Sequence, residues 1–186
     1  MNQYILLDAM NSQPLFIDSN NVPHWYAIYT QSRHEKKIAR LLSEKGLTNY
    51  LPLIEVYHRW SDRYQKVLTP LFSCYVFVFM ALRDRFKVLQ TDGVIKLVSF
   101  NGQPATIPDH QIDAIKRIMT EKMRIDPINC FVTGKKVRVR QGPLKGIEGT
   151  LVHKNNKNRF VIAIDGIRQA LSIEIDYRDL EILREG

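Results

Sequence analysis

Apolar and polar positions alternate in distinct blocks along the chain, and the first blocks predict a strand followed by a helix. Trp25–Tyr29 is aromatic and β-branched, as strands commonly are. Ser32 can cap a helix in which Ile38 and Leu42 recur at helical spacing. Gly46 fits the position just after the end of that helix.

The middle of the chain carries the most apolar segment. Residues 49–57 predict a second strand, and the polar residues 58–69 predict an exposed hairpin or loop. The run 71–80 (LFSCYVFVFM) is typical of a strand in the centre of a sheet. Because it is apolar on both faces, such a strand needs cover on both. One cover is the domain's own helices, and a partner helix is a candidate for the other.

Two more helices and a strand complete the first half. Residues 83–90 predict a short amphipathic helix and 94–100 a strand, followed by the hairpin signal Asn101-Gly102. Pro108-Asp109 opens a last helix with an isoleucine-rich face. The order β-α-β-β-α-β with a trailing helix predicts an α+β fold of the ferredoxin-like split βαβ type.

The second half has a different period. Short alternating strands around Val137, Thr150, Ile162 and Ile173 recur about every ten residues, which predicts a small SH3-like β-barrel. We expect four segments: a flexible tail over 1–23 in which 4–7 can add a strand, a first domain over 24–123, a linker over 124–132, and the barrel over 133–186.

The composition is that of a globular protein with a polyanionic neighbour. Of 186 residues, 45% are hydrophobic and 25% charged, which excludes a disordered chain, collagen and a disulfide scaffold. The net charge of +8 favours nucleic acid as a neighbour. Both halves contribute, with 16 basic and 11 acidic side chains over 1–124 and 11 and 8 over 125–186.

The sequence contains no pattern for membrane insertion or catalysis. No apolar run reaches the ~20 residues that cross a bilayer, and the N-terminus lacks a signal-peptide pattern, so we expect a cytoplasmic protein with no membrane partner. Cys74, Cys130 and the five histidines show no metal-ligand spacing. No phosphate loop or hydrolase motif is present, so we expect no enzyme, no metal and no cofactor.

Two stretches resemble known families. Residues 134–152 (GKKVRVRQGPLKGIEGTLV) resemble the KOW motif, in which a Gly-Pro turn and further glycines join two strands. Trp25–Tyr29, Glu35-Lys36-Lys37 and 70–78 (PLFSCYVFV) resemble the amino-terminal (NGN) domain of the NusG family of transcription elongation factors. Together the resemblances cover residues 24–183, and a ribosomal KOW protein would not carry the first domain.

A finer resemblance is to specialised members of that family. Residues 60–63 (WSDR) and 98–104 (VSFNGQP) are similar to RfaH-like proteins, especially to the antiterminators of capsular polysaccharide operons in Bacteroides. This implies an operon-specific antiterminator that suppresses pausing and termination. A housekeeping NusG that acts on most genes with Rho is the alternative. A KOW-containing protein associated with the ribosome or RNA is a second alternative.

The resemblance implies that the first domain binds the clamp helices of RNA polymerase through an apolar cavity. The matching positions lie on the first strand, the central strand and the last helix: Tyr29, Phe72, Tyr75, Phe77, Ile115 and Ile118. Ordinary core packing is the competing interpretation for these residues. A second polymerase contact is implied at the helix start over 83–87, although this sequence lacks the His-Thr-Thr-Thr run of RfaH-like proteins.

Basic residues near aromatic ones point to DNA. In 58–69 they suit single-stranded or melted DNA, since cations contact phosphates and rings stack on bases. The resemblance implies upstream or non-template DNA as the neighbour of this hairpin and of the first helix. The candidate residues are Arg33, Lys37, Arg59, Arg63 and Lys66. The helix positions that match the DNA-reading residues of RfaH-like proteins differ chemically: Gln31, Leu41, Glu44 and Lys45. A solvated charged face is the competing interpretation.

The resemblance also implies that the barrel contacts Rho or a small-subunit ribosomal protein through an exposed loop. The matching tip holds Ile167 as an exposed anchor, with Arg168 beside it. An isoleucine that folds inward is the competing interpretation. Alternating β-branched residues over 159–175, interrupted by Gly166, argue against a helical form of this domain.

Overall fold

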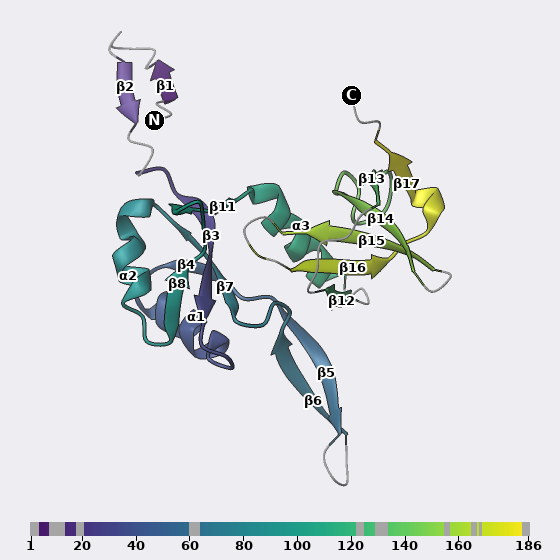
Figure 1. Cartoon of the computed structure of the whole chain (residues 1–186), viewed down its shortest axis with the longest axis horizontal. Helices are drawn as coiled ribbons and strands as arrows, with labels where there is room; N and C mark the ends of the chain where they lie inside the picture. The colour runs from purple at the N-terminus through teal and green to yellow at the C-terminus, as the bar shows by residue number, and fades with distance from the viewer. Residues whose placement is uncertain are drawn as a thin grey trace. The chain divides into compact units, whose positions relative to one another are not determined.

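The computed structural model of the chain divides into two compact units (Figure 1). Unit 1 comprises Met1–Tyr50 and Cys74–Thr106, and unit 2 comprises Leu51–Ser73 and Ile107–Gly186. The structure describes residues 4–7, 14–17, 21–59, 64–121, 125–128, 134–154, 157–164, 167 and 169–183.

Unit 1 is organised around a five-stranded sheet. The central strands are β3 (His24–Thr30) and β7 (Tyr75–Met80), which pair antiparallel. On either side, β4 (Thr48–Tyr50) pairs with β7, and β8 (Val94–Leu97) pairs with β3. β11 (Thr106–Ile107) also lies next to β3. The two most aromatic runs of the sequence therefore form the centre of the sheet.

Two helices pack against this sheet. α1 (Glu35–Glu44) contacts β4 and β7, and α2 (Arg85–Leu89), which follows the 3-10 helix η2 (Leu82–Asp84), contacts β8. Ile38 and Leu42 of α1 are fully buried, as the helical spacing predicts, and so is Val88 of α2. These residues supply the helical side of the unit 1 core.

The start of α1 is held by Glu35, and the predicted cap at Ser32 is wrong. The N-cap residue is His34, and it makes no capping bond with its side chain. The buried Glu35 carboxylate instead accepts a hydrogen bond from the backbone N–H of Cys74, at 2.8 Å. The helix end agrees with prediction, because Gly46 has a left-handed φ of 73°.

Three predicted strands are shorter or divided. The strand over 49–57 is interrupted at Pro52, so that β4 and the hairpin strand β5 (Leu53–Arg59) are separate. The strand over 71–80 begins only at Tyr75, because Cys74 has a φ of 64° that breaks the extended backbone. The strand over 94–100 divides into β8 and β9 (Ser99–Phe100).

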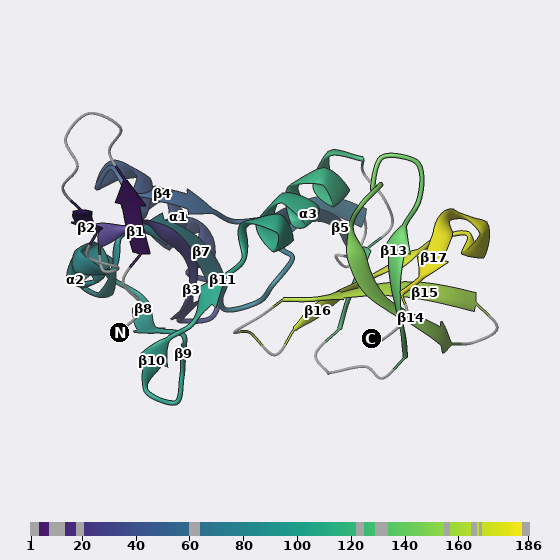
Figure 2. The ribbon, with the colours of Figure 1, turned by 90° about the horizontal axis from the view of Figure 1, so that it is seen from above.

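A small hairpin follows β8 (Figure 2). β9 pairs with β10 (Gln103–Pro104), and both turn residues between them, Asn101 and Gly102, have positive φ, at 49° and 77°. Positive φ at both positions is what an Asn-Gly hairpin turn requires, so the predicted turn is present. The Phe100 side chain beside it is 75% exposed.

Two strands lie inside the segment predicted as a tail. β1 (Tyr4–Leu7) is the strand that the sequence allows, and it pairs antiparallel with β2 (Pro14–Ile17). The sequence did not predict β2, because asparagines interrupt the short apolar patches of this segment. Pro14 occupies the first strand position, where a missing N–H is tolerated.

Unit 2 contains a hairpin, a helix and a second sheet. The hairpin pairs β5 with β6 (Tyr64–Pro70), and α3 (Asp109–Thr120) matches the predicted last helix. An antiparallel six-stranded sheet has the order β12-β16-β15-β14-β13-β17. Its strands are β12 (Ile125–Ile128), β13 (Lys135–Val139), β14 (Glu148–Lys154), β15 (Lys157–Ala163), β16 (Ala170–Glu174) and, after the 3-10 helix η3 (Tyr177–Asp179), β17 (Leu180–Ile182).

The four strands that alternation predicts in this sheet are present, and two others were missed. Val137, Phe160 and Ile173 are fully buried in the interior of the sheet. The predicted linker over 124–132 contains β12, which pairs with β16. Its Pro127 argued against a strand, but β12 is at the edge of the sheet, where proline is tolerated.

Candidate functional site

Alternation along β3 and β7 gives the sheet of unit 1 an aromatic face. The β3–β7 register places Trp25 opposite Phe79 and Tyr29 opposite Tyr75, and β4 adds a tyrosine opposite Phe77. We define the aromatic face as Trp25, Tyr29, Tyr50, Tyr75, Phe77 and Phe79. Its rings pair with centroids 5.3 Å apart for Trp25–Phe79, 5.4 Å for Tyr29–Tyr75 and 6.4 Å for Tyr50–Phe77.

Burial varies across this face. Phe77 is fully buried, whereas Tyr29 and Tyr75 are half-buried. Burial raises the pKa of Tyr50 to about 12, which keeps its hydroxyl protonated. The ammonium of Lys96 lies 5.9 Å from the ring centroid of Tyr29 and places a cation beside the half-buried pair. The face therefore has a buried interior at Phe77 and an accessible end at Tyr29 and Tyr75.

The six residues predicted to bind polymerase therefore differ in accessibility. Tyr29 and Tyr75 are brought together at the accessible end, while Phe77 supports them from the core. Phe72 is buried in the turn before β7, and Ile115 and Ile118 are buried on α3. Trp25 and Phe79 also belong to the face but were not among the predicted residues, although the period of two along β3 and β7 contained that signal.

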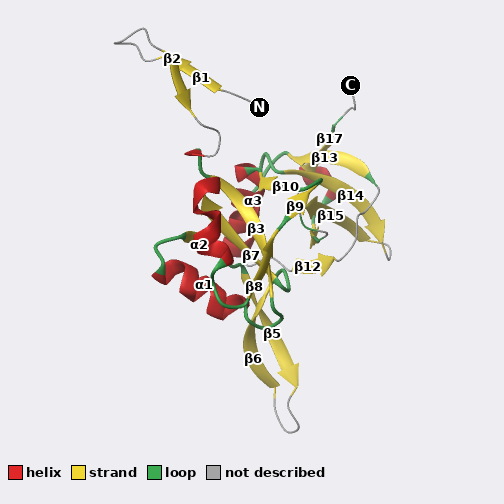
Figure 3. Cartoon of the chain, turned by 60° about the vertical axis from the view of Figure 1, so that its left-hand side comes forward, coloured by secondary structure: helices red, strands yellow, loops and turns green. Residues whose placement is uncertain are grey.

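The hairpin β5–β6 is a two-stranded antiparallel ribbon (Figure 3). Cross-strand pairing places Glu55, Tyr57 and Arg59 opposite Leu68, Lys66 and Tyr64, so that all six share one face, which is a second candidate surface. We call these six residues the outer face, and each of them is exposed. Tyr57 is 62% exposed and Tyr64 69%. The opposite face carries Val56 and Val67, which are half-buried.

Electrostatics on the outer face centre on Lys66. Its ammonium lies 3.3 Å from a Glu55 carboxylate oxygen and 5.5 Å from the Tyr57 ring centroid. The hydrogen bond to Glu55, with a smaller contribution from Tyr57, raises the pKa of Lys66, so this residue stays charged. Glu55 therefore offsets part of the positive charge that Lys66 presents.

The basic positions of α1 are also partly neutralised. Lys37 donates to an Asp92 carboxylate oxygen at 2.6 Å, and this bond lowers the pKa of Asp92. Arg33 is exposed at the turn before α1. Lys45 donates to the backbone oxygen of Lys87 and the hydroxyl of Thr91, so it ties α1 to the end of α2.

The candidate residues at two loop tips are either outside the described residues or buried. Arg63 and Arg168 lie outside the described residues. Ile167 is only 3% exposed, so the prediction that it is an exposed anchor is wrong in this structure. The isoleucine packs inward because it is apolar and its burial removes that surface from water.

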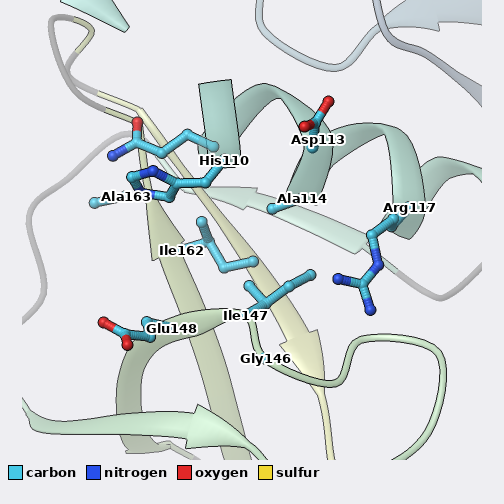
Figure 4. A pocket seen from close by; sticks show the side chains of 10 residues that line it. His110, Asp113, Ala114, Arg117, Gly146, Ile147, Glu148, Ile162 and Ala163 are labelled. Atoms are coloured by element: carbon cyan, nitrogen blue, oxygen red, sulfur yellow. The ribbon is translucent and has the colours of Figure 1, made fainter. Parts of the chain in front are cut away.

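A cavity of about 490 Å³ lies between α3 and the six-stranded sheet, both in unit 2 (Figure 4). The apolar lining comes from Ala114 of α3, from Ile162 of β15 and from Ile147 immediately before β14, and His110 and Glu148 are at the margin of the cavity. The guanidinium of Arg117 donates to the backbone oxygens of Pro143 and Lys145 and thereby joins α3 to the turn before β14.

Neither a metal site nor a membrane span is found in the part of the chain that the structure describes. No group of three or more His, Cys, Asp or Glu residues there is arranged to hold a metal ion. No helix in the same residues has the length and apolar character needed to cross a membrane.

The family of the chain is decided by its match to a family model described as NusG, transcription termination factor nusG, over residues 23–116. The chain belongs to the NusG family. The NusG protein of Vibrio vulnificus is 26% identical over 174 residues, which cover 86% of this chain and 95% of the relative. The NusG protein of Rickettsia conorii is 22% identical and covers 87% and 91%. Both relatives are described as transcription termination/antitermination proteins.

A solved structure confirms the predicted fold class. Thermotoga maritima NusG, described as showing domain interaction, aligns with a TM-score of 0.50 at 19% identity, covering 89% of this chain and 99% of the other. The α+β fold with an NGN domain followed by a strand-rich KOW-like domain is therefore correct. This chain is a NusG-like transcription termination/antitermination factor, and factors of this family act with RNA polymerase.

Proposed function

We propose that this NusG-family factor binds the clamp helices of RNA polymerase through its aromatic face and suppresses pausing and termination on a restricted set of operons. On this proposal the first domain, residues 24–123, bridges the polymerase cleft and disfavours clamp opening. The second domain, residues 133–186, recruits another factor, either Rho or a small-subunit ribosomal protein. Basic residues of α1 and of the hairpin β5–β6 lie near upstream or non-template DNA.

The accessible Tyr29–Tyr75 pair carries this proposal. Two half-buried tyrosines, backed by the fully buried Phe77, form a rigid amphipathic anchor with little side-chain entropy to lose on binding. An apolar helix face laid across the pair would complete the cover of β7, whose two faces are both apolar.

The restriction to particular operons, among them polysaccharide biosynthesis genes, is supported by sequence. Residues 98–104 are similar to the specialised antiterminators, and they form the β9–β10 hairpin with its exposed Phe100. The identities of 26% and 22% to NusG proteins are low, which is compatible with a specialised role for this chain. A ribosomal KOW protein is disfavoured, because the match to the family model lies over residues 23–116.

Genome-wide occupancy of the tagged protein, measured beside that of RNA polymerase in the native cell, tests the proposed function. We expect signal on one or a few long operons. Signal that follows polymerase on most genes would replace the specialised role with the housekeeping one. Absence of enrichment on transcribed DNA would contradict both roles and favour a ribosomal partner.

A further inference from the structure

Glu35, at the start of α1, is a buried acidic residue that the proposed polymerase contact does not itself use, and it is only 5% exposed. We propose that Glu35 is the positioning residue of the Tyr29–Tyr75 pair, because its carboxylate holds the backbone of Cys74 in the conformation from which β7 starts. This inference rests on the proposed function, which makes the pair a polymerase anchor, and it names the residue that sets the position of that anchor.

Cys74, immediately before β7, has an unfavourable backbone conformation. Its φ of 64° lies in the left-handed region, which a residue with a Cβ rarely adopts. Such a conformation persists only where the surrounding structure fixes it. The N–H of Cys74 donates to Oε1 of Glu35 at 2.8 Å, and its carbonyl oxygen accepts from the N–H of Thr30 at 2.9 Å. Cys74 is therefore held by α1 through one backbone group and by the end of β3 through the other.

These two bonds lie directly beside the aromatic pair in the chain. Tyr75 follows Cys74, and Tyr29 precedes Thr30, so the bond to the Cys74 carbonyl continues the β3–β7 pairing just past the two tyrosines. A change of φ at Cys74 would alter the direction in which the chain enters β7 at Tyr75. The bond to Glu35 therefore fixes where the Tyr75 ring of the accessible end lies.

Helix stabilisation is the competing role for this carboxylate. An acidic residue in the first turn of a helix interacts favourably with the helix dipole, and Glu35 is in the first turn of α1. That interaction needs only a negative charge, which an exposed side chain supplies equally well, whereas the Glu35 carboxylate is buried and bonded to the turn before β7. The two roles thus require different properties: the dipole requires the charge, and the Cys74 bond requires an acceptor oxygen at the right reach.

Two conservative variants of the full chain separate these properties. Glu35→Gln keeps an acceptor oxygen at the same reach and removes the charge. Glu35→Asp keeps the charge and shortens the side chain by one methylene. Glu121→Asp, the same change at an exposed residue at the end of α3, is the matched control. Polymerase affinity and hydrogen exchange of the Cys74 amide are measured below the thermal midpoint of each variant, so that loss of the fold does not enter the comparison.

Glu35→Asp should lose at least about fivefold in polymerase affinity and should lose the exchange protection of the Cys74 amide, since a backbone N–H deprived of its acceptor is costly. Glu35→Gln should retain both properties, and Glu121→Asp should behave as the wild type does. Provided that Tyr75→Ala weakens polymerase binding, wild-type affinity of Glu35→Asp would overturn the proposal. An equal loss in Glu35→Gln would also overturn it and assign the effect to charge.

A double-mutant cycle shows whether Glu35 acts through Tyr75. In a Tyr75→Ala background, Glu35→Asp should change polymerase affinity by less than about twofold, because the ring that Glu35 positions is absent. A full loss that persists in this background would overturn the positioning role and show that Glu35 acts on binding by another route.

The contact between the Tyr29 and Tyr75 rings, followed by NMR in the free protein, separates this inference from the proposed function. Loss of the ring contact in Glu35→Asp and its retention in Glu35→Gln would support the positioning role. If Tyr75→Ala then binds polymerase as the wild type does, the proposed function is refuted and the positioning role stands. An unchanged ring contact in Glu35→Asp would overturn the positioning role and leave the polymerase anchor standing.

Discussion

The ring of Tyr29 lies edge-on against the ring of Tyr75, with centroids 5.4 Å apart and planes inclined at 64°. The two residues are direct partners in the β3–β7 register. Because such aromatic pairs contribute roughly 0.5–1.5 kcal/mol beyond the burial of their area, each ring holds the other in position before a partner arrives. The two rings at the accessible end of the aromatic face are thus already positioned by each other before a partner binds.

Glu55 should weaken the contact of the outer face with DNA. Its carboxylate lies 3.3 Å from the Lys66 ammonium and offsets that charge. Glu55→Gln should therefore raise affinity for single-stranded DNA at low salt by up to about fivefold, the range of an exposed ion pair. Glu121→Gln, which makes the same change of charge at the end of α3, is the control. Equal gains in both variants would indicate an effect of net charge alone.

Tyr50 should make the protein less stable at high pH. Its pKa is about 12 in the folded chain against 10.0 for an ordinary tyrosine, so the unfolded chain loses this proton first. The corresponding stability is present below pH 10.0 and is lost as the pH rises towards about 12. Denaturant unfolding across this window should show a smaller loss for Tyr50→Phe than for the wild type. Identical pH profiles would contradict the burial of this hydroxyl.

Gly149 of β14 should resist substitution more than Gly142, which lies in the turn before it. A Cβ there would lie 2.6 Å from the Val161 backbone oxygen and 2.7 Å from a Phe160 ring carbon. Gly149→Ala should cost about 2 kcal/mol or more in the free energy of unfolding, as overpacking does. Gly142→Ala meets nothing within 4 Å and has only the strain of its φ of 80°. Chemical denaturation that ranks Gly142→Ala as the costlier change would contradict this close approach.

Local pattern was sufficient for elements whose own residues favour their conformation, wherever their partners lie in the sequence. The aromatic and β-branched residues of Trp25–Tyr29 predicted β3, and the Asn101-Gly102 pair predicted the turn of the β9–β10 hairpin. The aromatic face also follows from the period of two, once β3 and β7 are known to be neighbours. That part of the candidate site could be read from residue spacing.

Other features depend on backbone conformation or distant pairing, which spacing does not encode. Because Cys74 has a positive φ, β7 begins only at Tyr75 and Phe72 lies in a buried turn, so the strand position expected for Phe72 was wrong. β12 forms only because β16, more than forty residues later, is its partner. The inward packing of Ile167 likewise depends on the tertiary fold.

The most direct test of the central claim is the affinity of Tyr75→Ala for purified RNA polymerase, measured together with the thermal midpoint of unfolding. Phe100→Ala, which changes a 75% exposed ring in unit 1 outside the aromatic face, is the control. We predict that Tyr75→Ala loses at least about tenfold in affinity, as anchor residues of an interface do, while loss of the aromatic pair lowers its thermal midpoint by only a few degrees. A lowered midpoint with unchanged polymerase affinity would show that Tyr75 is core and would contradict the account.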